Sequence, residues 1–560
     1  MKKIAIIIGS VVLIFGMLFS SSCSDMLDTD SDRFVSTGDN KLDSANDTLY
    51  SLVGILKQLQ EVGDRYVVLG EVRGDLMALT ENADLDLQAI NNFTATADNP
   101  YVTSKEYYAI INNCNYFIQN VDTSVVAGGV KVLLKEYAAI KGIRAWTYMQ
   151  IALNYGKAIY FENPILTLED MEKDYPSYDM IQLADKLIED LLPYEDVDFP
   201  RYSIWNGSYS LFPLSFLLGE LYLWKGEGFY EMAAQKYYNL ISKKRYNILG
   251  GSNISGSDIF QNRWLNSSFD SWRYGWGDMF FNWSSEIITT INYTYEYGRN
   301  SNIYNLTRPL AAAQPYEYKL APSQVAIDMW DNEIYTYYDS DRKIFTYNNG
   351  DLRGTSPSNS MSGYSASYER MWNQTGDSVN AITKYLNAPR TPSIYIYRAG
   401  ILYLRYAEAV NLAGKPSLAF AVLKHGLHPE TIADQTIPSP VSPSEVNPLP
   451  TYANFSFLES YNKDYIIGIH ERGSGDASMD SLYYMIPELE TKSDSIRFVD
   501  QMIFNELGLE TAFEGHRFHD LMRFAIRRDD NNFLADRVGK KNPAVAEKLR
   551  TRSNWYLPIQ

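Results

Sequence analysis

Histidine and cysteine are scarce in this chain, with five histidines and two cysteines among 560 residues. So few cysteines exclude a scaffold built on several disulfides. Positive charge is also in short supply, because 50 lysines and arginines face 68 aspartates and glutamates, and the formal net charge is −18. Nucleic acid and anionic lipid attract the opposite sign of charge. We therefore expect neither to be the main partner.

Long apolar runs are equally scarce, and the clearest one lies at the start of the chain. Lys2 and Lys3 precede an apolar run over 4–19, and three serines follow at 20–22. This run is shorter than the roughly 20 residues that span a bilayer. Residues 1–22 are therefore predicted to be an export signal.

Cys23 directly follows that signal. A cysteine there resembles the lipobox of bacterial lipoproteins, whose thiol is acylated, although Ser20 stands where the pattern usually has a leucine-like residue. The alternative is a cleaved secretory peptide with an incidental cysteine. The polar, acidic segment 23–40 is typical of a flexible tether, which leaves 41–560 as the folded body. If Cys23 is acylated, Cys114 has no disulfide partner and is predicted to be a small buried residue on a helix.

Apolar residues recur at helical spacing along much of the chain. The segments predicted to be helical are 42–59, 103–121, 130–154, 177–192, 211–225, 229–242, 395–413, 416–427 and 494–526. Alternation typical of strands is scarce, and is clearest in EIITTINYTYEYG (286–298) and NWYLPI (554–559). The fold class is therefore predicted to be mainly α.

Two stretches look like related helix pairs, LLGELYLWKGEGFYEMAAQKYYNLI (217–241) and YAEAVNLAGKPSLAFAVLKHG (406–426). Small residues at Gly219, Ala233, Ala407 and Ala419 would let antiparallel helices approach closely. Close packing of this kind is typical of tetratricopeptide helix pairs. Two unrelated helical hairpins are the alternative.

Aromatic residues are abundant, at 14% of the chain with 44 tyrosines. RWLNSSFDSWRYGWGDMFFNW (263–283) holds four of the ten tryptophans, separated by glycine, serine, asparagine and aspartate. Such long polar and aromatic stretches between helical blocks are typical of binding loops. The alternative is a loop that packs its own tryptophans against the scaffold.

Residue patterns for catalysis are weak. His516 and His519 lie one helical turn apart, but no further ligand is evident, so they are predicted to make structural hydrogen bonds. GIHERGSGD (468–476) lacks the lysine of a phosphate loop and is interpreted as a turn. The acidic clusters at 28–32 and 82–86 lack the glycine and closing glutamate of a calcium loop. We therefore predict no enzyme, no metal and no cofactor, with a secreted glycoside hydrolase as a remote alternative.

Four blocks of sequence together resemble the SusD/RagB family of outer-membrane nutrient-binding lipoproteins. They are the start at Cys23 followed by SDMLD, KEYAAIKGIRAWTYMQIALNYGKAIYF (135–161), ILYLRYAEAVNLAGKPSLAFAVL (401–423) and FNELGLETAFEGHRFHDLMRF (504–524). The last is the most specific, and the closing NWYLPIQ is also similar. The second block departs from the family, because GKAIYF replaces its usual Gly-Asp-hydrophobic-Pro.

The resemblance implies a SusD-like body, with tetratricopeptide-like helix pairs as scaffold and long irregular loops and a few short strands as the ligand face. It implies an amino-terminal part over about 41–250 and a carboxy-terminal part over about 251–560. It also implies a lipid anchor in the outer membrane, facing the cell exterior, and a SusC-type TonB-dependent transporter as partner. The ligand is then an oligosaccharide that is captured without being cleaved, or a peptide as in some relatives.

The residues predicted to bind the ligand are aromatic plates, which stack on the apolar face of a sugar ring, together with polar neighbours. They are Trp264, Trp272, Tyr274, Trp276, Tyr364, Tyr368, Trp372, Arg73 and Asp75. Arg73 and Asp75 are included because the family commonly contributes polar ligand contacts from that region. The block at 504–524 is predicted to be structural, with Phe513, His516, Phe518 and Leu521 at helical spacing.

Overall fold

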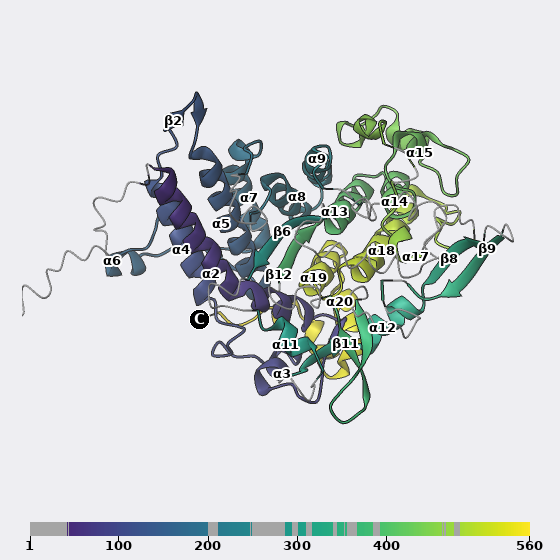
Figure 1. The fold of residues 1–560 in the computed structure, drawn as a ribbon, viewed down its shortest axis with the longest axis horizontal. Coiled ribbons are helices and arrows are strands. Elements are labelled where there is room, and N and C mark those ends of the chain that lie inside the picture. The colour runs from purple at the N-terminus through teal and green to yellow at the C-terminus, as the bar shows by residue number, and fades with distance from the viewer. Residues whose placement is uncertain are drawn as a thin grey trace, which may run out of the picture.

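The computed structural model describes residues 42, 44–199, 211–246, 248, 286–293, 301–309, 316–339, 344–351, 353–354, 367–384, 393–461, 463, 466–474 and 482–559. Its fold is mainly helical, as predicted (Figure 1). The longer helices are α2 (Ala45–Glu71), α4 (Lys105–Asn120), α5 (Leu134–Tyr155), α7 (Met180–Leu191), α8 (Leu214–Lys225), α9 (Tyr230–Ile241), α13 (Ala399–Leu412), α14 (Pro416–Lys424), α18 (Lys492–Thr511), α19 (Arg517–Arg527) and α20 (Asn531–Lys541).

These helices form an array in which each packs against the next. The neighbours run α2, α4, α5, α7, α8, α9, α13, α14 and α18, and Figure 1 shows α2 to α14 side by side across the molecule. The two predicted pairs, α8–α9 and α13–α14, are joined through contact between α9 and α13. They are therefore consecutive members of one array rather than unrelated hairpins.

The small residue at Gly219 allows the first pair to approach closely. A Cβ atom at this position would lie 2.6 Å from the ring of Tyr237 on α9. The Tyr237 hydroxyl donates a 2.7 Å hydrogen bond to Glu220, so the ring is fixed against α8. Ala233, Ala407 and Ala419 are also fully buried, as the close-packing interpretation requires.

Short two-stranded sheets complete the described fold. The antiparallel pairs are β1 (Met77–Leu79) with β7 (Leu320–Pro322), β2 (Val126–Ala127) with β3 (Val130–Lys131), β4 (Ala158–Ile159) with β5 (Ser177–Tyr178), β6 (Ile287–Asn292) with β12 (Ser393–Arg398), β8 (Ile334–Asp339) with β9 (Ile344–Asn349), and β10 (Tyr368–Trp372) with β11 (Ser378–Ile382). β6 lies in the stretch predicted to be a strand, and β12 occupies the first residues of the segment predicted to be helical from 395.

Short helices connect these elements. They are α3 (Leu85–Asn91), α6 (Leu168–Met171), α11 (Ile303–Thr307), α12 (Gln324–Asp331), α15 (Pro429–Ala433), α16 (Pro443–Val446), α17 (Glu471–Ser474) and α21 (Ala546–Leu549). Asp84, from the acidic cluster 82–86, caps α3 by accepting a hydrogen bond from the Leu87 amide. Among the described residues, no helix combines the length and the apolar composition that crossing a bilayer requires.

Two predictions of secondary structure are wrong. The segment NWYLPI is not a strand, because residues 552–555 form a 3-10 turn and Leu557 donates a backbone hydrogen bond to Asn154 at the end of α5. The segment 494–526 is not one helix, because a turn separates α18 from α19. Phe513 and Gly515 in that turn have positive φ angles of 70° and 92°, which no α-helix accommodates.

Candidate functional site

Much of the predicted ligand surface lies outside the described residues. This holds for Trp264, Trp272, Tyr274, Trp276 and Tyr364, and also for the predicted acylation site Cys23. The described members of the set are Arg73, Asp75, Tyr368 and Trp372.

Arg73 and Asp75 lie inside the scaffold. Arg73 follows the end of α2, where its Nε donates a 2.8 Å hydrogen bond to the Leu69 carbonyl and its guanidinium lies 4.3 Å from the centre of the Phe518 ring. Burial alone would raise the pKa of Asp75, but Arg517, at 2.6 Å, holds it below its usual value. Both side chains are buried. Their contacts join α2 to α19 and leave neither side chain on a ligand-accessible surface.

Tyr368 and Trp372 lie at opposite ends of β10 and differ in exposure. Tyr368 is 4% exposed, and its ring stacks on Trp330 with the centroids 5.5 Å apart. Trp372 is 74% exposed, beside a tight turn in which the Asn373 side chain accepts hydrogen bonds from the amides of Thr375 and Asp377. Only Trp372 of this pair presents an open aromatic face to a ligand.

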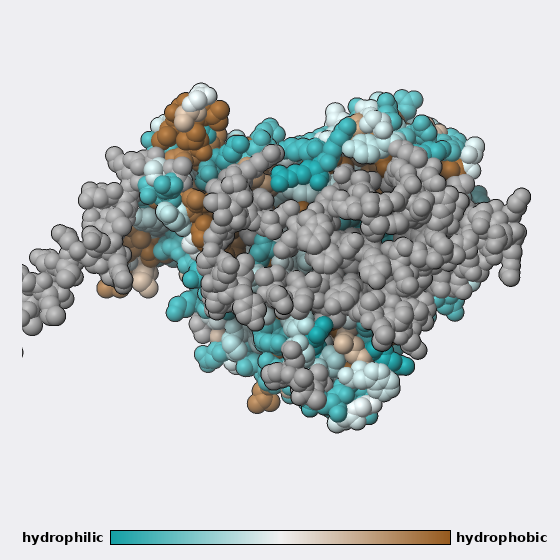
Figure 2. All heavy atoms as spheres, in the orientation of Figure 1, coloured by the Kyte–Doolittle hydropathy of each residue, from teal (hydrophilic) through white to brown (hydrophobic). Residues whose placement is uncertain are grey.

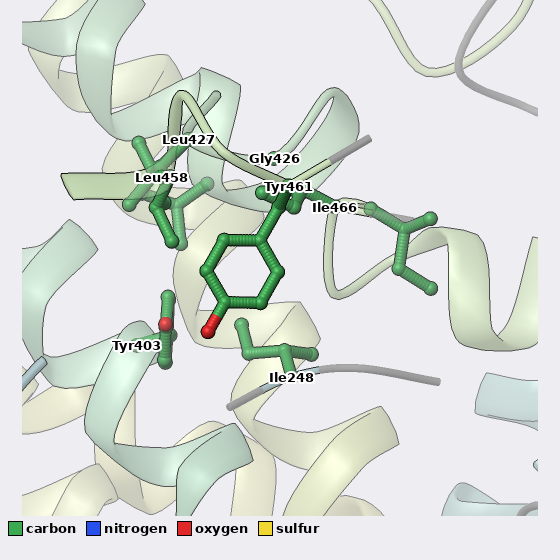
Figure 3. Close-up of a pocket in the computed structure, with 9 residues that line it drawn as sticks. Ile248, Tyr403, Gly426, Leu427, Leu458, Tyr461 and Ile466 are labelled. Carbon is green, nitrogen blue, oxygen red and sulfur yellow. The ribbon is translucent and has the colours of Figure 1, made fainter. Parts of the chain in front are cut away.

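One pocket, drawn in Figure 3, is too small for a sugar. Its volume is about 20 Å³, and Tyr403 and Tyr461 point into it from opposite sides. A space of this size holds about one water molecule. The remaining lining shown in Figure 3 is mainly aliphatic, and Tyr461 is 37% exposed, so this pocket is a packing gap at the edge of the core.

A larger cleft lies between the end of α5 and the start of α7. Its volume is about 330 Å³. The lining combines four aromatic rings with polar and charged side chains, and consists of Tyr160, Phe161, Glu162, Asn163, Pro164, Asp170, Lys173, Tyr175, Pro176, Tyr178 and Lys186. This combination of apolar faces and convergent polar groups is typical of small-molecule sites.

Hydrogen bonds hold the floor of the cleft. The hydroxyl of Tyr148, on α5, donates to the Phe161 carbonyl at 2.7 Å and accepts from the Phe161 amide at 3.0 Å. The Asn115 side chain, on α4, donates to the same carbonyl at 2.9 Å. Asn112 binds both backbone groups of Ile165, at 2.6 and 3.1 Å. These bonds fix the backbone before any ligand arrives, which reduces the entropy lost on binding.

The far wall of the cleft begins where β5 pairs with β4. Asp179 then caps α7 by accepting hydrogen bonds from the amides of Ile181 and Gln182, both at 3.0 Å, and the Gln182 side chain accepts from the Asp179 amide. This reciprocal cap fixes the direction in which the chain enters α7. Tyr178, which precedes the cap, is therefore held in a defined position.

The four rings are inclined to one another, and two of them are partly exposed, whereas Tyr160 and Phe161 are each only 6% exposed. Tyr160 and Tyr178 have centroids 5.8 Å apart and planes inclined at 58°, and Phe161 and Tyr175 are 5.5 Å apart at 53°. Tyr175 and Tyr178 are half-buried, so part of each ring faces the cleft. Inclined, partly exposed rings offer an apolar surface to the CH face of a pyranose.

The charges that line the cleft balance. Glu162 and Asp170 oppose Lys173 and Lys186, and Lys173 lies 2.6 Å from Asp170. The Tyr160 hydroxyl donates to Glu162 at 2.9 Å. A neutral, hydroxyl-rich ligand suits such a site better than a strongly charged one, because no excess charge is left to neutralise.

This cleft was not predicted from the sequence. The four rings fall within 160–178, and the first two, Tyr160 and Phe161, are the last residues of the GKAIYF segment that departs from the family pattern. The cluster of aromatics beside asparagine and proline was the available signal, but the cleft forms only when β5 returns to pair with β4.

His516 and His519 are buried and make structural hydrogen bonds, as predicted. The Tyr66 hydroxyl lies 3.1 Å from His516 Nδ1, and His519 Nε2 lies 3.2 Å from Asn154 Oδ1. Burial lowers the pKa of His516 to about 4, and it lowers the pKa of His519 well below its usual value. In the described part of the chain, no group of three or more histidine, cysteine or acidic side chains is placed to hold a metal ion. Cys114 is buried, which raises the pKa of its thiol to about 12.

Five buried carboxylates and four buried cations form a network of ion pairs in the carboxy-terminal half of the chain. The carboxylates are Glu286, Asp351, Glu506, Glu510 and Glu514, and the cations are Arg353, Lys384, Arg398 and Arg472. Each member is at most 4% exposed, so none offers a carboxyl group to a polymer at the surface. The turn predicted at 468–476 supplies Arg472 to this network, from α17.

Comparison with known structures identifies the fold. A SusD superfamily protein from Bacteroides thetaiotaomicron aligns with a TM-score of 0.57 at 15% identity, covering 92% of this chain and 95% of that one. A putative sugar-binding protein from Bacteroides vulgatus aligns with a TM-score of 0.55 at 16% identity, covering 87% of this chain and 88% of that one. Surface glycan-binding protein A from Bacteroides fluxus aligns with a TM-score of 0.52 at 16% identity, covering 90% of this chain and 92% of that one. No family model and no curated protein matches the sequence.

The chain therefore has the SusD-like fold over about nine-tenths of its length. This confirms the fold expected from the sequence blocks. At 14–16% identity the similarity establishes architecture, and the ligand has to be argued from the chain's own surface.

Proposed function

We propose that this protein is a cell-surface lipoprotein that captures an oligosaccharide and delivers it, uncleaved, to a SusC-type TonB-dependent transporter in the outer membrane. Support comes from the SusD-like fold and from the sugar-binding and glycan-binding proteins among its structural neighbours. The observation that carries the proposal is the preformed cleft, with inclined aromatic rings and balanced charge. Trp372 and the tryptophans at 264, 272 and 276 are proposed as further stacking surfaces.

The Tyr178→Ala variant should lower glycan affinity by about tenfold or more, because aromatic anchors dominate small recognition surfaces. Its thermal stability should change little, since the ring is half-buried. Calorimetric titration with pullulan, laminarin, xyloglucan, arabinan and mannan oligosaccharides, beside thermal melts, measures both effects. Binding should also depend little on salt, because stacking and neutral hydrogen bonds are not screened.

Matched variants locate the site. Tyr50→Ala removes an exposed tyrosine from α2, outside the cleft, and should leave affinity unchanged. Trp372→Ala and alanine variants at 264, 272 and 276 report on the other stacking surfaces. A binding glycan whose affinity survives Tyr178→Ala but falls with a tryptophan variant would move the site away from the cleft. Binding of peptides but none of the glycans would support the peptide-capturing alternative, and release of products would indicate a hydrolase.

Replacing Cys23 with alanine should release the protein from membranes. Acyl chains contribute about 0.8 kcal/mol per buried methylene, and the acidic chain offers no electrostatic substitute. Fractionation of cells that lack the transporter measures the effect. A variant that still sediments with membranes would contradict the lipoprotein interpretation.

A further inference from the structure

The β2–β3 hairpin exposes apolar side chains without covering any part of the core. Val126 is 58% and Val130 57% exposed, and Ala127 and the turn glycines Gly128 and Gly129 are exposed as well. The two glycines have φ angles of 60° and 80°, as a tight two-residue hairpin turn requires. Figure 2 shows apolar residues gathered where this hairpin projects from one end of the molecule.

The apolar groups lie on both faces of the hairpin. Val126 pairs with Lys131, and Ala127 pairs with Val130. Because successive residues of a strand point to opposite faces, Val126 lies on one face while Ala127 and Val130 lie on the other. A partner that covers one face would leave the other apolar face in water. An apolar medium that surrounds the tip removes both faces from water.

The chain from Cys23 joins the folded body beside this hairpin. The Leu42 amide donates to the Asn120 carbonyl at 3.1 Å, and the Asp122 amide donates to the Leu42 carbonyl at 3.3 Å. Figure 1 shows β2 close to the amino-terminal end of α2. Eighteen residues lie between Cys23 and Leu42, and a chain of that length reaches at most about 70 Å even when fully extended. An acylated Cys23 would therefore keep the end of the body that carries the hairpin within reach of the bilayer.

Local charge does not oppose this contact. The segment 122–136 contains two acids, Asp122 and Glu136, and two lysines, Lys131 and Lys135, so it is neutral in a chain of net charge −18. The hairpin is also too short to span a bilayer, and its outward backbone groups need water or lipid headgroups as partners. Shallow contact at headgroup depth meets both requirements.

We propose that the β2–β3 hairpin inserts into the interfacial layer of the bilayer that holds the lipid anchor, and so sets the orientation of the body on the membrane. This rests on the proposed acylation of Cys23. The occupant is lipid, recognised by the apolar tip rather than by charge.

The test uses acylated, full-length protein with Val126→Cys labelled by an environment-sensitive fluorophore. Cys114 is buried with a raised thiol pKa, and acylated Cys23 has no free thiol, so position 126 alone is labelled. In phosphatidylcholine vesicles the emission should shift to the blue, and lipids with a spin label near the headgroup should quench it severalfold more than in the control. The control is Met232→Cys, an exposed apolar site on α9. Val130→Asp in the labelled chain should reverse the shift.

The outcomes separate this inference from the function on which it rests. Protein that does not float with vesicles at all would contradict membrane anchoring through the acylated Cys23. Protein that floats while the fluorophore at 126 stays in water would overturn the hairpin proposal and leave the anchor intact. A shift that appears only when the transporter is added to the vesicles would also overturn it, and would assign the hairpin to a protein partner.

Discussion

Replacing Glu510 with alanine is expected to lower the free energy of unfolding by about 3–5 kcal/mol. The Glu510 carboxylate lies 2.5 Å from Arg398, 2.6 Å from Arg472 and 2.8 Å from Arg353, and all four side chains are almost completely buried. Burial opposes ionisation, but these arginines hold the pKa of Glu510 below its usual range. Removing the carboxylate leaves three guanidinium groups with too little buried negative charge. Chemical denaturation of the variant measures the loss.

An exposed ion pair provides the control. Glu547, 92% exposed, lies 3.1 Å from Arg550, and Glu547→Gln should cost at most about 1 kcal/mol.

The lowered pKa of Glu510 leads to a second expectation, which concerns the pH dependence of the wild-type protein. A carboxyl group with a lowered folded pKa stabilises the fold above its unfolded pKa and loses that contribution as the pH falls. Stability should therefore fall between about pH 5 and pH 2, with a weaker dependence in the Glu510 variant. Equal stability of the variant and wild type would show that the network contributes nothing net.

The helices could be predicted because their signal is local. Apolar spacing of three and four residues located α4, α5, α7, α8 and α9 to within a few residues. A small residue at Gly219 even indicated where two helices touch. Each of these inferences depends on residues within one helix or within two consecutive helices, which a single sequence contains.

The errors arise where distant segments decide the structure. NWYLPI alternates like a strand, but its backbone partner is the end of α5, about 400 residues earlier. Asp75 looked like a polar ligand contact, yet it pairs with Arg517, 442 residues away. Tyr368 looked like a stacking plate, yet Trp330 covers it. The cleft at 160–178 depends on strand pairing that periodicity does not report.

The Phe513→Ala variant is expected to cost about 3–5 kcal/mol, as other large-to-small changes in protein cores do. Phe513 is fully buried in the turn between α18 and α19, with its ring centroid 5.8 Å from that of Trp330. Alanine would leave a cavity there and would still have to adopt the positive φ angle of 70°. Chemical denaturation gives the change in the free energy of unfolding.

The same variant tests whether the block at 504–524 has any part in binding. Its turn lies apart from the residues that line the cleft, so glycan affinity per folded molecule should not change. Tyr50→Ala, which removes an exposed aromatic ring, should cost almost nothing in stability. A Phe513 variant that kept its free energy of unfolding but lost glycan binding would contradict the structural role of this block. The turn would then be part of the ligand surface rather than a segment that positions α19 against α2.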